Sequence, residues 1–195
     1  MRELKQYCQK FNKHSLRRTI FESFSLENLS FDSIIIKNLI NFLDNLTFNS
    51  MAIYSPTKYE IDTVEIFYYL KKRKIDIFYP RVSSDLLEFG SVDKLDDLKK
   101  GKFGVREPRS SKNTNIDYID FFLIPCLAID TNNKRLGYGG GFYDKAMKNI
   151  DSEKTFAILR PERLINDFSA EAHDIRIGRV ISVEKQSTEG SYELN

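Results

Sequence analysis

Cysteine is scarce in this sequence, which argues against a protein stabilised by disulfides or by structural zinc. The two cysteines, Cys8 and Cys126, lie far apart in unlike surroundings, and neither belongs to a CxxC or Cys/His pattern. Neither a disulfide framework nor a zinc site is therefore expected. Cys126 stands in an apolar run, which predicts a small buried hydrophobic residue.

Long hydrophobic runs are also missing. The longest apolar run, at 121–129, is interrupted by Pro125 and falls far short of the roughly 20 residues that span a bilayer. No N-terminal segment has the apolar stretch of a signal peptide. The sequence therefore predicts a cytoplasmic protein that does not enter a membrane.

An excess of one charge is missing as well. The chain has 30 basic and 28 acidic residues and a net charge of +2. This balance gives no general attraction to nucleic acid or membrane, so any anion site must be local. Aromatic-basic RNA motifs are absent too, which disfavours an RNA-associated module.

What is present is an ordinary globular composition, with 41% hydrophobic and 30% charged residues. A chain of 195 residues is long enough for the core of one domain and short for two, so one domain over 1–195 is expected. No internal repeat is found. The tail after about 185 is polar and is expected to be frayed.

The apolar pattern predicts alternating helices and strands. Helical spacing of apolar residues is found at 1–24, 31–46, 61–70 and 142–150. The first of these segments fits two helices or one broken helix. Strands are expected at 51–54, 75–79, 86–89, 119–124, 155–159 and 180–183. The strand at 75–79 is expected to stop at Pro80, and the strand at 86–89 to lie at an edge of the sheet. Residues 91–115 are expected to form a long polar loop with a short helix. The alternation indicates an α/β layer with a largely parallel sheet.

Ligands of open α/β sheets bind beyond the carboxyl ends of the strands. Three segments are expected to lie at that edge, namely 55–63, 80–81 and 125–144. The last contains a glycine-rich loop, because four of the five residues from position 137 to 141 are glycine.

The glycine-rich loop has the parts of a nucleoside triphosphate site. Glycine reaches positive φ, so several N–H groups can point into one concavity, and a helix begins close behind. Lys134 and Arg135 supply cations, and Asp144 is a carboxylate of the kind that holds Mg²⁺. A flexible glycine turn explains the glycine content equally well. The loop lacks the Gly-Lys-Ser/Thr ending of a Walker A motif and is not the usual dinucleotide fingerprint.

Residues 135–144 resemble the R-L-G-x-G-x-G-[FY]-Y-D signature of 5-formyltetrahydrofolate cyclo-ligases, also called methenyltetrahydrofolate synthetases. Further segments that resemble the family follow in its order at 13–17, 60–63, 78–82, 103–108, 124–130 and 173–174. Four positions outside the decamer depart from the family pattern: Cys126 replaces glycine, Arg163 glutamine, Ala172 proline and Gly178 an acidic residue.

The resemblance implies a fold, a reaction and two ligands. The fold would be a single three-layer α/β domain of the NagB/RpiA-like Rossmannoid type, with helices flanking a largely parallel sheet. The reaction would be ATP-dependent cyclisation of 5-formyltetrahydrofolate to 5,10-methenyltetrahydrofolate, through phosphorylation of the formyl oxygen. ATP would be the co-substrate, with Mg²⁺, and a reduced formyl folate the substrate.

The resemblance also implies site residues. ATP would contact Lys13, His14, Ser15, Leu16, Arg17, Arg135, Leu136, Gly137, Tyr138, Gly139, Gly140, Gly141, Phe142 and Tyr143. The folate would contact Ser55, Glu60, Tyr138, Gly139, Gly140, Gly141 and Phe142, with Glu60 accepting hydrogen bonds from the pterin. Tyr143 and Arg135 would be catalytic, and Asp144 and Asp174 would bind Mg²⁺.

Other interpretations of these residues stay open. Lys13 and Arg17 also fit a solvated basic helix face, Glu60 a charge at a helix N-terminus, and Asp174 a turn or cap. The whole chain also fits a non-catalytic nucleotide- or folate-binding regulator, or another ATP- or sugar-phosphate-handling enzyme. A monomer is expected, because no long apolar helix face is left without a place in the core.

Overall fold

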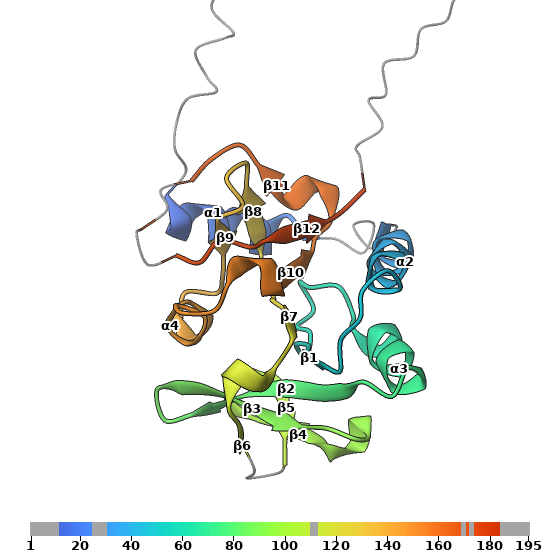
Figure 1. Cartoon of the computed structure of the whole chain (residues 1–195). Coiled ribbons are helices and arrows are strands. Elements are labelled where there is room, and N and C mark those ends of the chain that lie inside the picture. The colour runs from blue at the N-terminus through green and yellow to red at the C-terminus, as the bar shows by residue number, and fades with distance from the viewer. Residues whose placement is uncertain (1–11, 25–30, 110–112, 169–170, 172–173, 184–195) are drawn as a thin grey trace, which may run out of the picture.

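The protein is described by a computed structural model that covers residues 12–24, 31–109, 113–168, 171 and 174–183. Its central sheet has seven strands in the order β12-β10-β7-β1-β2-β3-β6 (Figure 1). Five of them pair in parallel: β12 (Arg179–Ile181), β10 (Thr155–Ile158), β7 (Phe121–Leu123), β1 (Ser50–Ala52) and β2 (Asp76–Ser83). Two are antiparallel: β3 (Leu86–Ser91) and β6 (Asn113–Thr114). The predicted α/β fold with a largely parallel sheet is confirmed.

Helices α2 (Asp32–Leu43) and α3 (Val64–Lys72) cover one face of the central sheet (Figure 1). α2 buries Ile35, Leu39 and Leu43, which recur every four residues and therefore share one face of the helix. These side chains join the sheet's own apolar residues in the largest core cluster. This packing fixes the strands whose carboxyl ends carry the site.

The opposite face of the sheet is covered by α4 (Phe142–Ala146) and by a small sheet of β11 (Leu164–Ile165), β8 (Ala128–Asp130) and β9 (Arg135–Leu136). Helix α1 (Lys13–Glu22) packs on the small sheet through Leu16 and Ile20. The glycine-rich loop begins directly after β9, so this packing brings α1 beside the loop.

The segment 91–115, predicted as a polar loop with a short helix, contains an antiparallel hairpin of β4 (Leu98–Lys100) and β5 (Arg106–Pro108). The short helix has a counterpart in the 3-10 turn η3 (Leu95–Asp97), but the absence of strands was wrong. The hairpin is held by backbone pairing, and most of its side chains are polar or exposed, so no apolar pattern marks it. Short 3-10 turns within the described residues include η3 (Leu95–Asp97), η4 (Lys102–Gly104), η5 (Ile116–Tyr118), η6 (Ser152–Lys154) and η7 (Pro161–Arg163).

Pro80 does not end β2, contrary to the prediction, because the strand continues to Ser83. The β1 partner of β2 stops opposite Phe78, so Pro80 has a paired strand on its β3 side alone. Proline lacks an N–H and is tolerated where one strand edge carries no ladder. The extension carries Val82 toward the site. β3, predicted as an edge strand, is covered by β6.

Three predicted helices have different limits. α2, predicted over 31–46, ends at Leu43. α3 begins at Val64 rather than 61, because the Asp62 carboxylate accepts a hydrogen bond from the Val64 N–H and holds the preceding residues in a turn. α4 ends at Ala146 rather than 150, and Asp151 then starts a new turn by accepting from the Glu153 N–H. The three strands of the small sheet were missed because they have only two or three residues each.

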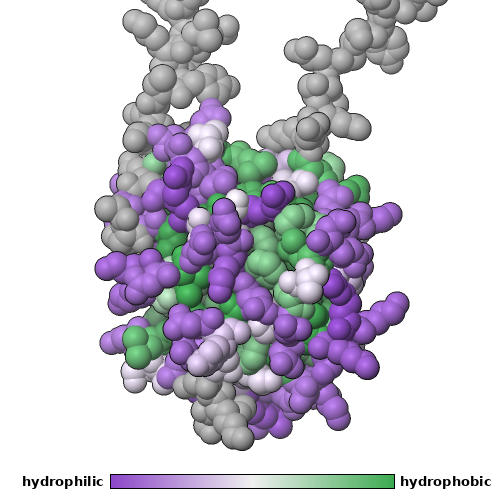
Figure 2. Space-filling view, viewed as in Figure 1, coloured by the Kyte–Doolittle hydropathy of each residue, from purple (hydrophilic) through white to green (hydrophobic). Residues whose placement is uncertain are grey.

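Cys126 is buried, as predicted, and burial raises the pKa of its thiol to about 12. Residues 1–11 of the predicted N-terminal helical segment, Cys8 and the tail after 185 lie outside the described residues. None of the helices in the described ranges combines the length and apolarity needed to cross a bilayer. The face shown in Figure 2 is mostly hydrophilic, with smaller apolar areas between the polar side chains.

Candidate active site

A cavity of about 530 Å³ opens where the loop after β1, the glycine-rich loop and the β4–β5 hairpin meet. The predicted edge segments supply much of its lining: Ser55, Thr57, Tyr59, Glu60, Pro80, Pro125, Arg135, Tyr138, Gly139, Gly140, Gly141, Phe142 and Tyr143. Tyr54, just before the first of these segments, also lines it. The remaining lining comes from β2, β3 and the hairpin: Val82, Leu87, Lys102, Phe103, Val105 and Glu107. Its size and its aromatic and aliphatic walls suit a small organic ligand.

Glu60 presents a buried carboxylate to this cavity. Its Oε2 accepts a hydrogen bond of 2.8 Å from the Thr57 N–H, while Oε1 is buried without a partner among the described residues. Burial raises the pKa of Glu60 to about 7, and the Thr57 hydrogen bonds and the nearby Arg135 oppose that rise. An unpaired buried acceptor is costly, so this carboxylate is poised to accept donors from a ligand.

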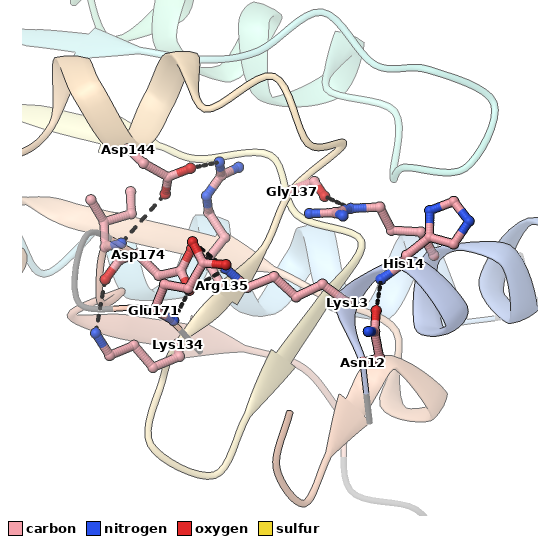
Figure 3. Close-up of polar contacts among 11 residues, drawn as sticks. Asn12, Lys13, His14, Lys134, Arg135, Gly137, Asp144, Glu171 and Asp174 are labelled. Atoms are coloured by element: carbon pink, nitrogen blue, oxygen red, sulfur yellow. Dashed lines mark hydrogen bonds and ion pairs between the residues drawn. The ribbon is translucent and has the colours of Figure 1, made fainter. Parts of the chain in front are cut away.

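Arg135 brings a buried cation to the same cavity and is 5% exposed. Its Nη1 donates to the Pro125 carbonyl at 2.7 Å, and its Nη2 lies 3.2 Å from Oδ2 of Asp144 (Figure 3). The guanidinium also lies 5.3 Å from the centre of the Tyr143 ring. A Cβ at Gly137 would lie 2.6 Å from Nη2 of Arg135, so glycine is needed there for the guanidinium to keep its place.

The glycine-rich loop links α1 to the loop after β1. Gly139 and Gly141 adopt φ values of 102° and 66°, which side-chain-bearing residues rarely adopt. Gly137 directly follows β9, and its carbonyl accepts a hydrogen bond of 2.7 Å from Nε of Arg17 on α1. On the other side, the Tyr138 hydroxyl hydrogen-bonds the Thr57 hydroxyl. Residues far apart in the sequence thus meet at one loop.

The two predicted metal carboxylates belong to segments that contact each other, and each carboxylate pairs with a cation. Asp174 pairs with Nζ of Lys13 at 2.6 Å, and Asp144 pairs with Arg135 (Figure 3). The Asp144 Oδ1 also accepts from the N–H of Ile175, the residue after Asp174. Among the residues that the structure describes, no group of three metal-ligating side chains is found. The donor set suits Mg²⁺ that arrives with phosphates, which complete its coordination, rather than a cage formed by protein alone.

Some predicted ATP residues do not face the cavity with their side chains. Leu16 and Leu136 are buried in the core between α1 and the small sheet. His14 is exposed, and the Ser15 hydroxyl donates to the Asn12 carbonyl. Any contact of these residues with a nucleotide would use the backbone or the outer face of α1.

Several lining residues were missed by sequence reasoning. Phe103 is 70% exposed on η4, with its ring 5.7 Å from the ring of Phe142. Thr57 supports both Glu60 and Tyr138. Phe103 and Val82 belong to the family-like segments 103–108 and 78–82, to which no role was assigned. Their resemblance to the family was the sequence feature that could have pointed to these two residues.

Comparisons with known proteins all indicate the same family. The model of the 5-formyltetrahydrofolate cyclo-ligase family matches residues 22–183. A 5-formyltetrahydrofolate cyclo-ligase of Mycoplasma pneumoniae is 27% identical over 179 residues, covering 89% of this chain and 99% of that protein. One of Mycolicibacterium smegmatis is 32% identical over 91 residues, covering 45% and 47%.

Solved structures agree with the fold. A 5,10-methenyltetrahydrofolate synthetase from Mycoplasma pneumoniae superposes with a TM-score of 0.71 at 26% identity, over 88% of this chain and 98% of that one. The synthetase from Aquifex aeolicus, at 23% identity, has a TM-score of 0.72 over 87% and 89%, and supports the fold alone. The chain therefore belongs to the 5-formyltetrahydrofolate cyclo-ligase family.

Proposed function

We propose that this protein converts 5-formyltetrahydrofolate and ATP to 5,10-methenyltetrahydrofolate, ADP and phosphate. The observation that carries the proposal is one cavity holding an unpaired carboxylate, Glu60, together with Arg135 and the glycine-rich loop. Family membership supports the reaction class and implies ATP as the co-substrate. The alternative of a non-catalytic regulator has no support among the relatives, which are named as enzymes.

The folate's pterin would occupy the part of the cavity near Glu60. A pterin presents an exocyclic amine and a ring N–H as adjacent donors, and one carboxylate accepts such a pair. Because Thr57 already engages Oε2, the unpaired Oε1 is the acceptor with free capacity. The aromatic walls would pack against the rest of the folate.

The ATP phosphates would lie against the glycine-rich loop, with Arg135, Lys13 and Arg17 as the cations. Arg17 and Lys13 approach from α1, where Arg17 binds the Gly137 carbonyl and Lys13 binds Asp174. Mg²⁺ would be held by Asp144 and Asp174 and would neutralise phosphate charge. If the metal took up these carboxylates, Lys13 and Arg135, which now pair with them, would be available to pair with the ATP phosphates.

The chemistry requires activation of a formamide, whose carbon is a poor electrophile. The formyl oxygen attacks the γ-phosphorus, an O–P bond forms, and the bond to ADP breaks. The N10 amine then attacks the activated carbon, loses its proton, and phosphate departs with the former formyl oxygen. Positioning and charge stabilisation carry the catalysis in such a transfer, and no protein nucleophile is needed.

Arg135 and Tyr143 are proposed to act directly on this reaction. Arg135 would stabilise the negative charge on the transferring phosphoryl group. Burial raises the pKa of Tyr143 well above its usual value, so its hydroxyl keeps its proton and can donate a hydrogen bond near the formyl group. The cavity walls would keep water from the phosphorylated intermediate.

We further propose one cyclo-ligase domain over 1–195 that acts as a cytoplasmic monomer and does not bind nucleic acid or membranes. The near-neutral net charge of +2 supports the last two points.

The proposal is tested by mixing the purified protein with 5-formyltetrahydrofolate, Mg²⁺ and ATP and following the near-ultraviolet absorbance of the methenyl product. An ATP-dependent rise is expected, reduced by about 10²-fold or more in an Asp144→Ala variant that has lost the partner of Arg135 and a metal ligand. A folded protein that binds both ligands without forming product would restore the regulator alternative. An unchanged rate in the variant would remove Asp144 from the site.

A further inference from the structure

Arg160 is a buried arginine with a fixed set of partners behind the candidate active site. It stands just beyond β10 and is 2% exposed. Its Nε and Nη2 each donate to one carboxylate oxygen of Asp32 at 2.7 Å. Such a two-point ion pair fixes the plane of the guanidinium as well as its position.

The free edge of this guanidinium binds the backbone of the loop after β1. Nη1 donates to the Tyr59 carbonyl at 3.0 Å, and Nη2 donates to the Glu60 carbonyl at 3.3 Å. These two carbonyls belong to the turn that carries the Glu60 side chain into the cavity. Arg160 itself is not among the residues that line the 530 Å³ cavity.

Asp32 anchors this contact to a rigid element. It lies in the first turn of α2, whose apolar face is buried against the central sheet. The chain Asp32–Arg160–Glu60 therefore joins the packed core to the substrate loop. If the guanidinium were lost, the Tyr59 and Glu60 carbonyls would lose their Arg160 donors, and the Asp32 carboxylate would lose its cation.

The turn also depends on weaker local contacts. The Glu60 N–H donates to the Thr57 carbonyl at 3.2 Å, and the Tyr59 N–H reaches the Thr57 hydroxyl at 3.3 Å. The Thr57 N–H also holds Oε2 of Glu60 at 2.8 Å. All these contacts lie within the turn and fix its internal shape, whereas the Arg160 contacts fix its place relative to α2.

We propose that Arg160, held by Asp32, is a positioning residue that sets the Glu60 carboxylate for folate recognition. This inference rests on the proposed function, in which Glu60 receives the pterin. Arg160 acts through the backbone of Glu60 and makes no contact with either ligand. Its loss weakens folate binding and leaves ATP recognition, which belongs to the glycine-rich loop and α1, in place.

The test compares the wild type with Arg160→Gln and Asp32→Asn. Calorimetry gives the Kd for 5-formyltetrahydrofolate without ATP, and steady-state assays give KM for each substrate and kcat. In Arg160→Gln we expect Kd and KM for the folate to rise about tenfold or more, with KM for ATP unchanged. Arg160→Lys keeps the charge without the two-point geometry, so we expect partial rescue.

Arg73 offers a matched control. Like Arg160, it bridges two carbonyls and lies near a carboxylate, 4.0 Å from Asp44, but its carbonyl partners, Leu43 and Leu46, do not line the cavity. Arg73→Gln should lower stability without changing the folate Kd. A double Asp32→Asn, Arg160→Gln variant should bind folate about as weakly as Arg160→Gln alone, since the two residues act as one unit.

The outcomes separate this inference from the proposed function. An unchanged folate Kd in Arg160→Gln, or an equal rise in Arg73→Gln, overturns the positioning role. If Arg160→Gln does not fold, the folate Kd of Asp32→Asn decides in the same way. A wild type that binds folate without turnover removes the proposed activity and leaves the Kd comparison valid.

Discussion

The buried Glu60 carboxylate lowers the stability of the folded protein and is proposed to recognise the folate. Its carboxylate is buried, one of its oxygens has no partner in the part of the chain that the structure describes, and burial raises its pKa to about 7. A raised pKa means that the ionised form is destabilised in the folded protein relative to the unfolded chain. Sites that need a charged group in an apolar cavity carry this cost until a ligand supplies donors.

The stability cost of Glu60 has a defined pH dependence. The folded protein holds the Glu60 proton up to a pKa of about 7, whereas the unfolded chain releases it near 4.5. The free energy of unfolding therefore falls as pH rises through this window, and the cost is fully present above it. Glu60→Gln removes the charge, so we expect the variant to be more stable than the wild type by about 2 to 3 kcal/mol at pH 8.

Urea unfolding at pH 8 and at pH 4 checks this expectation, because the difference should disappear at the lower pH. The same variant should bind 5-formyltetrahydrofolate more weakly. The Gln side chain has one acceptor oxygen, and its NH₂ group would face the donors of the pterin. A variant that is less stable than the wild type at pH 8 would contradict the buried-charge account.

At the scale of elements, the β4–β5 hairpin matters because it supplies one wall of the cavity. Its 3-10 turn η4 carries Phe103, whose φ of 62° projects an exposed ring toward Phe142 of α4. Lys102, Val105 and Glu107 of the same hairpin also line the cavity. The segment therefore supplies more residues to the cavity wall than to the apolar core.

Phe103→Ala tests the role of the hairpin. The ring is 70% exposed, so we expect little change in the free energy of unfolding, while KM for the folate rises about tenfold from lost aromatic contact. Alanine keeps the same backbone strain at positive φ, which isolates the effect of the side chain. Steady-state kinetics and thermal unfolding measure both quantities.

Tyr118→Ala is the control for Phe103→Ala, because Tyr118 is 78% exposed on η5 and does not line the cavity. Its KM for the folate should match that of the wild type. Equal KM values in Phe103→Ala and the wild type would show that this wall does not contact the substrate.

At the scale of the whole molecule, the sequence predicted the alternating elements and the edge where the site forms. Apolar runs such as 119–124 lie in the buried sheet, and the glycine pattern located the loop between β9 and α4. Local signals suffice for such features, because periodicity and glycine conformation act within a few residues.

Contacts across long sequence distances could not be predicted in this way. Arg160 and Asp32 are separated by 128 positions, and nothing near either residue marks it as half of a pair. The β4–β5 hairpin depends on backbone pairing, which leaves no apolar pattern in its side chains. The partners of Asp144 and Asp174 likewise follow from the packing of α1 and α4 rather than from spacing.

If ATP activates the folate by phosphorylating its formyl oxygen, that oxygen must leave in the released phosphate, and isotope transfer measures this. 5-Formyltetrahydrofolate labelled with ¹⁸O in the formyl group would be converted with ATP and Mg²⁺, and the released phosphate analysed by mass spectrometry. We expect one labelled oxygen in the phosphate for each methenyl product. Methenyl product formed together with unlabelled phosphate would show that the formyl oxygen is not phosphorylated.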